Sequence, residues 1–136
     1  MEAEETMSIT SSIEPDHTLT VFKGTGTISF DEITEAMKHF YGGKPTLNVL
    51  WDLTDATEIP LTSEEVQRIA SMPPRYNGSK RPAGKTAIVV DDDFFFGLAR
   101  MFEIHGTVNQ LPHSVQIFRE LTSARKWIES GSPDVP

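Results

Sequence analysis

Two groups of aspartates follow apolar segments that we expect to form strands. Asp52 lies near the end of the run Leu47–Leu53, and the triplet Asp91–Asp93 follows directly after Thr86–Val90. In an open parallel sheet, ligands bind at the carboxyl ends of the strands. Asp52 and Asp91 at such an edge could hold Mg²⁺ or act as an acid/base pair. The alternative, capping of the helix that follows, is favoured because no Lys, His or second carboxylate motif accompanies these residues.

Two hydroxyl residues, Thr62 and Ser63, stand at the start of a predicted helix. Glu65 follows Thr62 by three residues, which is the spacing of a capping box. In that motif the hydroxyl and the carboxylate each accept a hydrogen bond from a backbone N–H of the first turn. We therefore expect Thr62 or Ser63 to cap the helix, and we also consider both as candidate binding residues.

The connection Met72–Lys85 concentrates positive charge in an acidic chain. Arg75, Lys80, Arg81 and Lys85 are four of its twelve Lys and Arg residues. Long ordered loops are often functional, and this one could receive an anionic ligand or an acidic partner. Arg75, Lys80 and Arg81 are therefore candidate binding residues. The alternative is a mobile, solvated loop, because charged loops normally stay exposed.

Three consecutive phenylalanines, Phe94–Phe96, begin another predicted helix. Only some of three adjacent side chains on one helix can face the core. At least one is therefore expected against a loop, a ligand cavity or another subunit, and we choose Phe95 as the candidate. A homodimer formed through exposed aromatics is one such outcome. The alternative is that the rings serve core packing alone.

The composition excludes several classes of function. Twelve Lys and Arg against twenty Asp and Glu give a formal net charge of −8, which repels nucleic-acid phosphates and anionic membrane surfaces. The absence of cysteine excludes a disulfide framework, a thiol nucleophile and thiolate metal sites. The four histidines have no metal-binding spacing. We therefore assign no catalytic residue, no metal, no cofactor and no nucleic-acid partner.

Hydrophobic periodicity predicts an α/β domain with five strands and four helices in the order β-β-α-β-α-β-α-β-α. Strands that alternate with helices imply crossover connections and a mostly parallel sheet, to which an N-terminal hairpin adds an antiparallel edge. Gly24–Thr27 is expected to be a turn, and Pro73 with Pro74 is expected to end the second helix. The predicted strands are Met7–Ile13, His17–Lys23, Leu47–Leu53, Thr86–Val90 and Val115–Phe118, and the predicted helices are Asp31–Tyr41, Thr62 to the residue before Pro73, Phe94–Val108 and Leu121–Ile128.

The length of 136 residues suits a single domain, which we place at 7–130. The acidic segment 1–6 and the segment 131–136 are expected to be flexible ends. The first residues carry three Glu, no Lys or Arg and no apolar run, so they do not resemble a secretory signal. No apolar stretch is long enough to span a bilayer. These features predict a cytoplasmic protein without integral membrane association.

Four segments have a distinctive pattern: LNVLWDL at 47–53, AIVVD at 87–91, VQIFRE at 115–120 and ARKWI at 124–128. In these segments and in element order, the chain resembles the SpoIIAA-like family. That family belongs with the sulfate-transporter and anti-sigma-factor-antagonist (STAS) fold and the related SEC14-like fold. The resemblance implies a stand-alone STAS-like domain whose function requires a partner outside the chain.

In signalling members of that family, a serine at the start of the helix after the central strand is phosphorylated by a partner kinase. Thr62 or Ser63 occupies the equivalent helix start. Leu61 stands where the family has an aspartate, and no glycine follows, so the resemblance does not extend to the phosphorylation motif. Capping is the better explanation for both hydroxyls.

The sequence therefore leads to two hypotheses. The first is a non-enzymatic binding or regulatory module that recognises a protein partner or a small apolar or anionic ligand. The alternative is a small enzyme that depends on a divalent metal and uses the strand-end aspartates Asp52 and Asp91.

Overall fold

The computed structural model of the chain describes residues 8–15, 18–75, 84–108 and 114–130. The segments 1–6 and 131–136, which we expect to be flexible, lie outside the described residues, as do Lys80 and Arg81. The described part forms one five-stranded sheet with four helices packed against it. Within this part, no helix combines the length and the apolar character that crossing a membrane requires.

The order of strands and helices agrees with the prediction from hydrophobic periodicity. Most boundaries lie close to the expected ones, and the first helix begins with a capping box between Ser29 and Glu32. The elements are β1 (Ile9–Ile13), β2 (Leu19–Thr27), α1 (Phe30–Gly42), β3 (Asn48–Glu58), α2 (Ser63–Arg75), β4 (Lys85–Val89), α3 (Asp93–Val108), β5 (Ser114–Phe118) and α4 (Leu121–Ile128).

The strands lie in the order β1-β2-β3-β4-β5 across the sheet. β1 pairs with β2 in antiparallel orientation, and the following three pairs are parallel. Each parallel pair is joined by one helix, because parallel strands require a crossover connection. The mostly parallel sheet with an antiparallel edge is thus confirmed.

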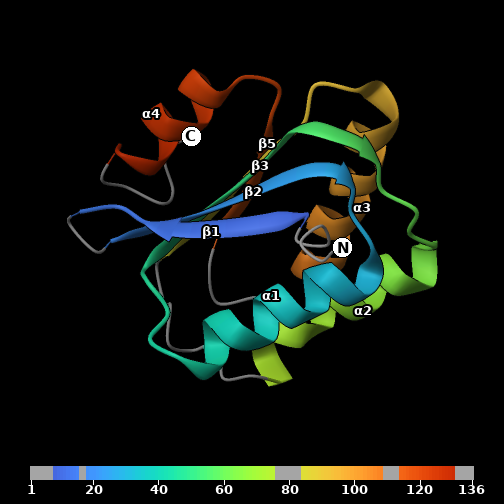
Figure 1. Cartoon of the computed structure of the whole chain (residues 1–136), viewed down its shortest axis with the longest axis horizontal. Helices are drawn as coiled ribbons and strands as arrows, with labels where there is room; N and C mark the ends of the chain where they lie inside the picture. Colours follow the sequence, from blue (N-terminus) through green and yellow to red (C-terminus); the bar gives the residue numbers. More distant parts are fainter. Residues whose placement is uncertain (1–7, 16–17, 76–83, 109–113, 131–136) are drawn as a thin grey trace, which may run out of the picture.

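Helices cover the two faces of the sheet unequally (Figure 1). α1, α2 and α3 pack on one face, and α4 packs on the opposite face. β4 lies between these layers and all five of its residues are buried. Successive side chains of a strand point to opposite faces. Ile88 therefore belongs to the core under α1–α3, and Ala87 and Val89 belong to the core under α4.

The segment Gly24–Thr27 is not a turn, which corrects the prediction. β2 continues through it and pairs Thr25 with Asp55 and Thr27 with Glu58, with shifts of register between Lys23 and Thr25 and between Gly26 and Thr27. Gly26 has a φ of 69°, a conformation that glycine adopts without steric penalty. Glycines that favour turns also permit such irregularities within a strand.

Two other predicted boundaries were wrong. β3 extends to Glu58, so Asp52 lies in the middle of the strand and not at its end. α2 includes Pro73 and Pro74 and ends at Arg75. A proline ring holds φ near the helical value, so the last turn keeps its helical backbone although neither proline donates a hydrogen bond.

Candidate functional site

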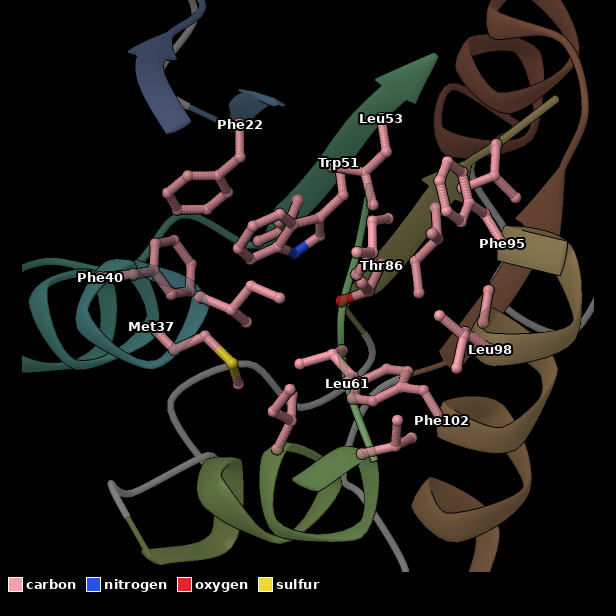
Figure 2. Close-up of a pocket in the computed structure, with 18 of the residues that line it drawn as sticks. Phe22, Met37, Phe40, Trp51, Leu53, Leu61, Thr86, Phe95, Leu98 and Phe102 are labelled. Atoms are coloured by element: carbon pink, nitrogen blue, oxygen red, sulfur yellow. The ribbon is translucent and has the colours of Figure 1, made fainter. Parts of the chain in front are cut away.

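An apolar cavity lies between one face of the sheet and the helices α1, α2 and α3 (Figure 2). Its volume is about 110 Å³. One water molecule needs much less space, and an engineered apolar cavity of about 150 Å³ binds benzene. The cavity between the sheet and α1–α3 is about three quarters of that size, so it can hold a molecule of at most about one ring.

The floor of the cavity comes from the central strands of the sheet. Val49, Trp51 and Leu53 of β3 face it, and so do Thr86 and Ile88 of β4. Residues at every second position of a strand share a face. The apolar runs that suggested strands buried on both sides therefore contribute half of their side chains to the cavity and half to the core under α4.

The walls of the cavity come from apolar stripes of the surrounding helices. Residues spaced three or four positions apart lie on one face of a helix. In α1 these are Ile33, Met37 and Phe40, and in α3 they are Phe95, Leu98 and Phe102.

Aromatic rings gather on one side of the cavity. The rings of Phe22 and Trp51 are stacked, with centroids 4.4 Å apart and planes inclined by 20°. Phe40 approaches Phe22 edge-on, with centroids 5.9 Å apart and an angle of 75°. Figure 2 shows the indole nitrogen of Trp51 turned toward the interior of the cavity. This side of the cavity thus combines aromatic surface with an indole N–H, which can only donate a hydrogen bond.

Thr86 contributes a buried hydroxyl to the lining. Its residue is 4% exposed, and its Oγ1 has no hydrogen-bond partner among the described residues. Figure 2 shows this oxygen directed into the cavity. A buried polar group without a partner costs about 1–3 kcal/mol. A molecule in the cavity that bonds to Thr86 would remove this cost.

The described lining of the cavity carries no charged side chain. The described residues that line it include no Asp, Glu, His, Lys or Arg. Lys85 precedes Thr86 but lies on the α4 side of the sheet, where its Nζ donates to the carbonyl of Trp127 at 2.6 Å and to Ser130 Oγ at 2.7 Å. Burial lowers the pKa of the Lys85 ammonium below its ordinary value.

Asp52 is placed on the α4 side of the sheet and is held by local contacts. Its Oδ1 accepts hydrogen bonds from the Thr54 amide at 3.1 Å and the Thr54 hydroxyl at 2.7 Å. Its Oδ2 lies 3.5 Å from Lys23 Nζ, which also lies 2.9 Å from Asp55. Burial by itself raises the pKa of Asp52, but the bonds from Thr54 and the charge of Lys23 outweigh burial and lower it.

Asp52 and Asp91 do not both follow the end of a strand. Asp52 is the register partner of Val89, in the middle of the longer strand β3, and Asp91 is exposed beyond β4. Within the described residues, no group of three or more His, Asp or Glu side chains is placed to hold a metal ion. Nothing in this arrangement supports the metal-dependent enzyme.

The predicted capping box at the start of α2 is confirmed. Thr62 Oγ1 accepts from the Glu65 amide at 3.1 Å, and Glu65 Oε1 accepts from the Thr62 amide at 3.0 Å. Ser63 is exposed at the first position of the helix. Neither residue lines the cavity, and a binding role for either stays a prediction.

The other candidate binding residues do not lie together at one site in the described structure. Arg75 is the last residue of α2, and Lys80 and Arg81 lie outside the described residues. Phe95 is buried, with 8% of its surface exposed, and lines the cavity. Phe94 is 67% exposed. Phe95 also belongs to the hydrophobic core, and a binding role for it stays a prediction.

Sequence reasoning missed Thr86 and Trp51 as site residues. Both stand in segments that were identified only as buried strands. A signal was present, since the alternation of side chains places Thr86 on the same strand face as Ile88 and Val90, among apolar side chains. What the sequence did not show is that this hydroxyl borders a cavity.

Comparison with known proteins identifies the fold of the chain. No family model matches the chain, and no curated protein matches it. The crystal structure of an uncharacterised protein of the DUF3478 family with a SpoIIAA-like fold, from Shewanella loihica PV-4, is similar, with a TM-score of 0.53 and 16% sequence identity. The match covers 88% of this chain and 91% of that chain. Together with the mostly parallel five-stranded sheet and its four helices, this similarity shows that the chain has a SpoIIAA-like fold.

Proposed function

We propose that the chain is a non-enzymatic binding module that holds a small, largely apolar molecule between the sheet and α1–α3. One observation carries this proposal: the Thr86 hydroxyl is buried without a partner, among the described residues, in a cavity with a mostly apolar lining. Buried polar groups in folded proteins are nearly always hydrogen-bonded. A ligand that bonds to Thr86 Oγ1 supplies the missing partner.

The packing of the core supports the same function. Protein interiors are close-packed, and side chains around an empty space lose dispersion contacts. A cavity of about 110 Å³ therefore costs stability while it is empty. An apolar molecule that fills it restores those contacts and removes further apolar surface from water.

The lining also explains why binding is proposed and not catalysis. General acid–base chemistry needs a positioned group such as His, Asp, Glu or Lys. The described lining residues include none of these four types, and the one lining residue with an ionisable side chain is Tyr41. The expected anionic ligand and the expected protein partner depend on the helix starts and on the basic connection, and most of that connection lies outside the described residues. The apolar ligand is therefore the one that the described residues favour.

Native mass spectrometry of freshly purified protein tests this proposal. The wild type is expected to carry a small molecule that is released on denaturation. Ala99 of α3 lines the cavity, so Ala99→Leu should occupy part of the space and reduce the bound fraction. Gln67→Leu makes a change to the same residue type at an exposed position of α2 and should retain the molecule.

Two results would contradict the proposal. The first is a bound molecule that Ala99→Leu retains as well as Gln67→Leu does, because the molecule would then lie elsewhere. The second is a wild type that carries nothing and whose melting temperature does not rise with saturating toluene, since any ligand of the folded state stabilises it. Circular dichroism of both variants shows whether the fold is intact.

A further inference from the structure

The cavity lining also indicates the chemical class of its ligand, and this inference rests on the proposed function. We infer that the ligand is an electrically neutral molecule of about one aromatic ring. It carries one hydroxyl or similar oxygen, which bonds to Thr86 Oγ1, and its ring lies beside Trp51. Size, polarity, charge and aromatic surface support this inference separately.

The size of the cavity favours a single ring. A volume of about 110 Å³ is of the order that holds benzene and is too small to enclose a long acyl chain. A single water molecule bonded to Thr86 would leave most of that volume unfilled. The occupant that fits is therefore a compact molecule and not a lipid tail.

The polar groups at the cavity favour one ligand oxygen. A threonine hydroxyl both donates and accepts, and an indole N–H only donates. Figure 2 shows Thr86 Oγ1 and the Trp51 indole nitrogen both turned toward the interior. A ligand oxygen suits both groups. Apart from Tyr41, the other described lining residues have apolar side chains, so most further polar groups on the ligand would lose their hydration without gaining partners.

The absence of charged side chains among the described lining residues requires a neutral ligand. The ammonium of Lys85 is bonded to Trp127 and Ser130 on the other face of the sheet. Burial of an unpaired carboxylate costs far more than burial of a neutral hydroxyl. A carboxylic acid should therefore bind more weakly than an alcohol of the same shape.

The aromatic side of the cavity favours a ring. Aromatic side chains attract other rings in offset-stacked and edge-on arrangements, beyond the effect of buried area. The stacked pair Phe22 and Trp51 and the edge-on ring of Phe40 already show both arrangements. A flat ligand can extend this group, and a saturated ring of the same size gains burial alone.

Tryptophan fluorescence can report binding at this site. The chain has two tryptophans, of which Trp51 lines the cavity and Trp127 packs against Phe118 on the α4 side. Trp127→Phe leaves Trp51 as the only reporter. Excitation at the red edge of indole absorption avoids the absorption of the probes.

The experiment compares p-cresol with three probes that each change one of its properties and with octanoate, which changes both the ring and the charge. Toluene lacks the hydroxyl of p-cresol, 4-methylcyclohexanol lacks its aromatic ring, 4-methylbenzoate replaces the hydroxyl by a charge, and octanoate represents an acyl chain. Each probe is titrated into the Trp127→Phe protein and into the same protein with Thr86→Val or Thr86→Ser. Thr86→Val should weaken p-cresol about tenfold and leave toluene unchanged, because it removes one hydrogen bond. Thr86→Ser keeps the hydroxyl and should restore p-cresol binding.

The outcomes separate this inference from the proposed function. Equal binding of p-cresol with and without the Thr86→Val substitution would show that the ligand does not bond to Thr86. Tighter binding of octanoate or 4-methylbenzoate than of p-cresol would show that the ligand need not be neutral. Tighter binding of 4-methylcyclohexanol than of p-cresol would show that the cavity does not prefer an aromatic ring. In each of these cases the cavity still binds a ligand and the proposed function stands. If no probe binds and Ala99→Leu behaves like Gln67→Leu, the proposed function fails as well.

Discussion

Lys85 and Thr86 are neighbours in β4, but their side chains leave the sheet on opposite faces and differ in their hydrogen bonding. Lys85 Nζ donates to the carbonyl of Trp127 at 2.6 Å and to Ser130 Oγ at 2.7 Å, on the α4 side. Thr86 Oγ1 is buried beside the cavity without a partner among the described residues. The alternation of side chains along a strand thus keeps a buried charge away from the cavity.

Thr86→Val should stabilise the protein in the absence of ligand. The substitution replaces an unpaired buried hydroxyl by a methyl group of similar shape in a central strand, where valine is also favoured. We expect the free energy of unfolding to rise by about 1 kcal/mol and the melting temperature by about 3 °C. Urea unfolding of ligand-free protein measures the change, and a loss of stability would show that the hydroxyl has a partner.

Thr20→Val provides the matched control on the same face of the sheet. Thr20 is also buried, but its Oγ1 lies 2.8 Å from Thr46 Oγ1 and takes part in a hydrogen bond. Removal of one partner from a buried hydrogen bond should lower the free energy of unfolding by about 1 kcal/mol. The two Thr→Val variants should therefore shift the urea midpoint in opposite directions.

Phe95→Ala should destabilise the protein, and Phe94→Ala should not. Phe95 is buried, so loss of its ring should cost about 3 kcal/mol of unfolding free energy. Phe94 is 67% exposed, and its truncation should change stability by less than about 0.5 kcal/mol. Urea unfolding distinguishes the two variants, and similar losses of stability would contradict the orientation of α3.

Light scattering of Phe94→Ser tests the predicted homodimer, since Phe94 is the exposed ring.

Asp52→Asn should destabilise the protein at neutral pH by about 1–2 kcal/mol, because Asp52 accepts two bonds from Thr54 as a charged group. The pKa of Asp52 is held below its ordinary value of 3.8. Its contribution is therefore complete above pH 3.8 and is lost as the pH falls through the folded-state pKa.

Urea titrations of the wild type and Asp52→Asn over a series of acidic pH values measure this effect. The difference between the two proteins should shrink as the pH falls below 3.8. Asp55→Asn is the control: Asp55 pairs with the same Lys23, but its side chain is 59% exposed, so its loss should cost less than about 1 kcal/mol. A constant difference between the wild type and Asp52→Asn down to the lowest pH would contradict the lowered pKa.

Lys85→Met should change how stability depends on alkaline pH. Burial lowers the pKa of Lys85 below its ordinary value of 10.5, so between the two pKa values the unfolded chain binds more protons than the folded protein. Stability then rises with pH over this window. The wild type should gain stability relative to Lys85→Met as the pH rises from neutral toward 10.5, as measured by urea unfolding at each pH. A parallel pH dependence of both proteins would show that the pKa of Lys85 is not lowered.

Local patterns predicted the features that depend on residues near one another in the chain. The capping box of Thr62 and Glu65 needs only a separation of three residues, and the structure confirms it. Helical spacing also placed Leu98 and Phe102 on the core-facing side of α3, but it began that side at Phe94, which is 67% exposed, and not at Phe95. The segment Gly24–Thr27 was misjudged because its extended backbone is stabilised by pairing with β3, about thirty residues further along the chain.

The same pairing explains the error at Asp52. β3 does not end there because Asp55, Ala56 and Glu58 continue to pair with β2. The Asp52 carboxylate therefore lies within the strand, on the face of the sheet that α4 covers, and not at an open strand end. A strand boundary depends on the partner strand as much as on its own residues.

The amino-acid sequence by itself determined the order of strands and helices, and which side chains of each element share a face, because both depend on periodicities of two and 3.6 residues. Only the tertiary structure decided that a cavity lies above Trp51 and that Thr86 meets it without a partner among the described residues. Cavity volume and hydrogen bonding of a buried hydroxyl depend on how α1, α2 and α3 pack against the sheet. The atoms involved come from segments far apart in the chain, so no local pattern contains this information.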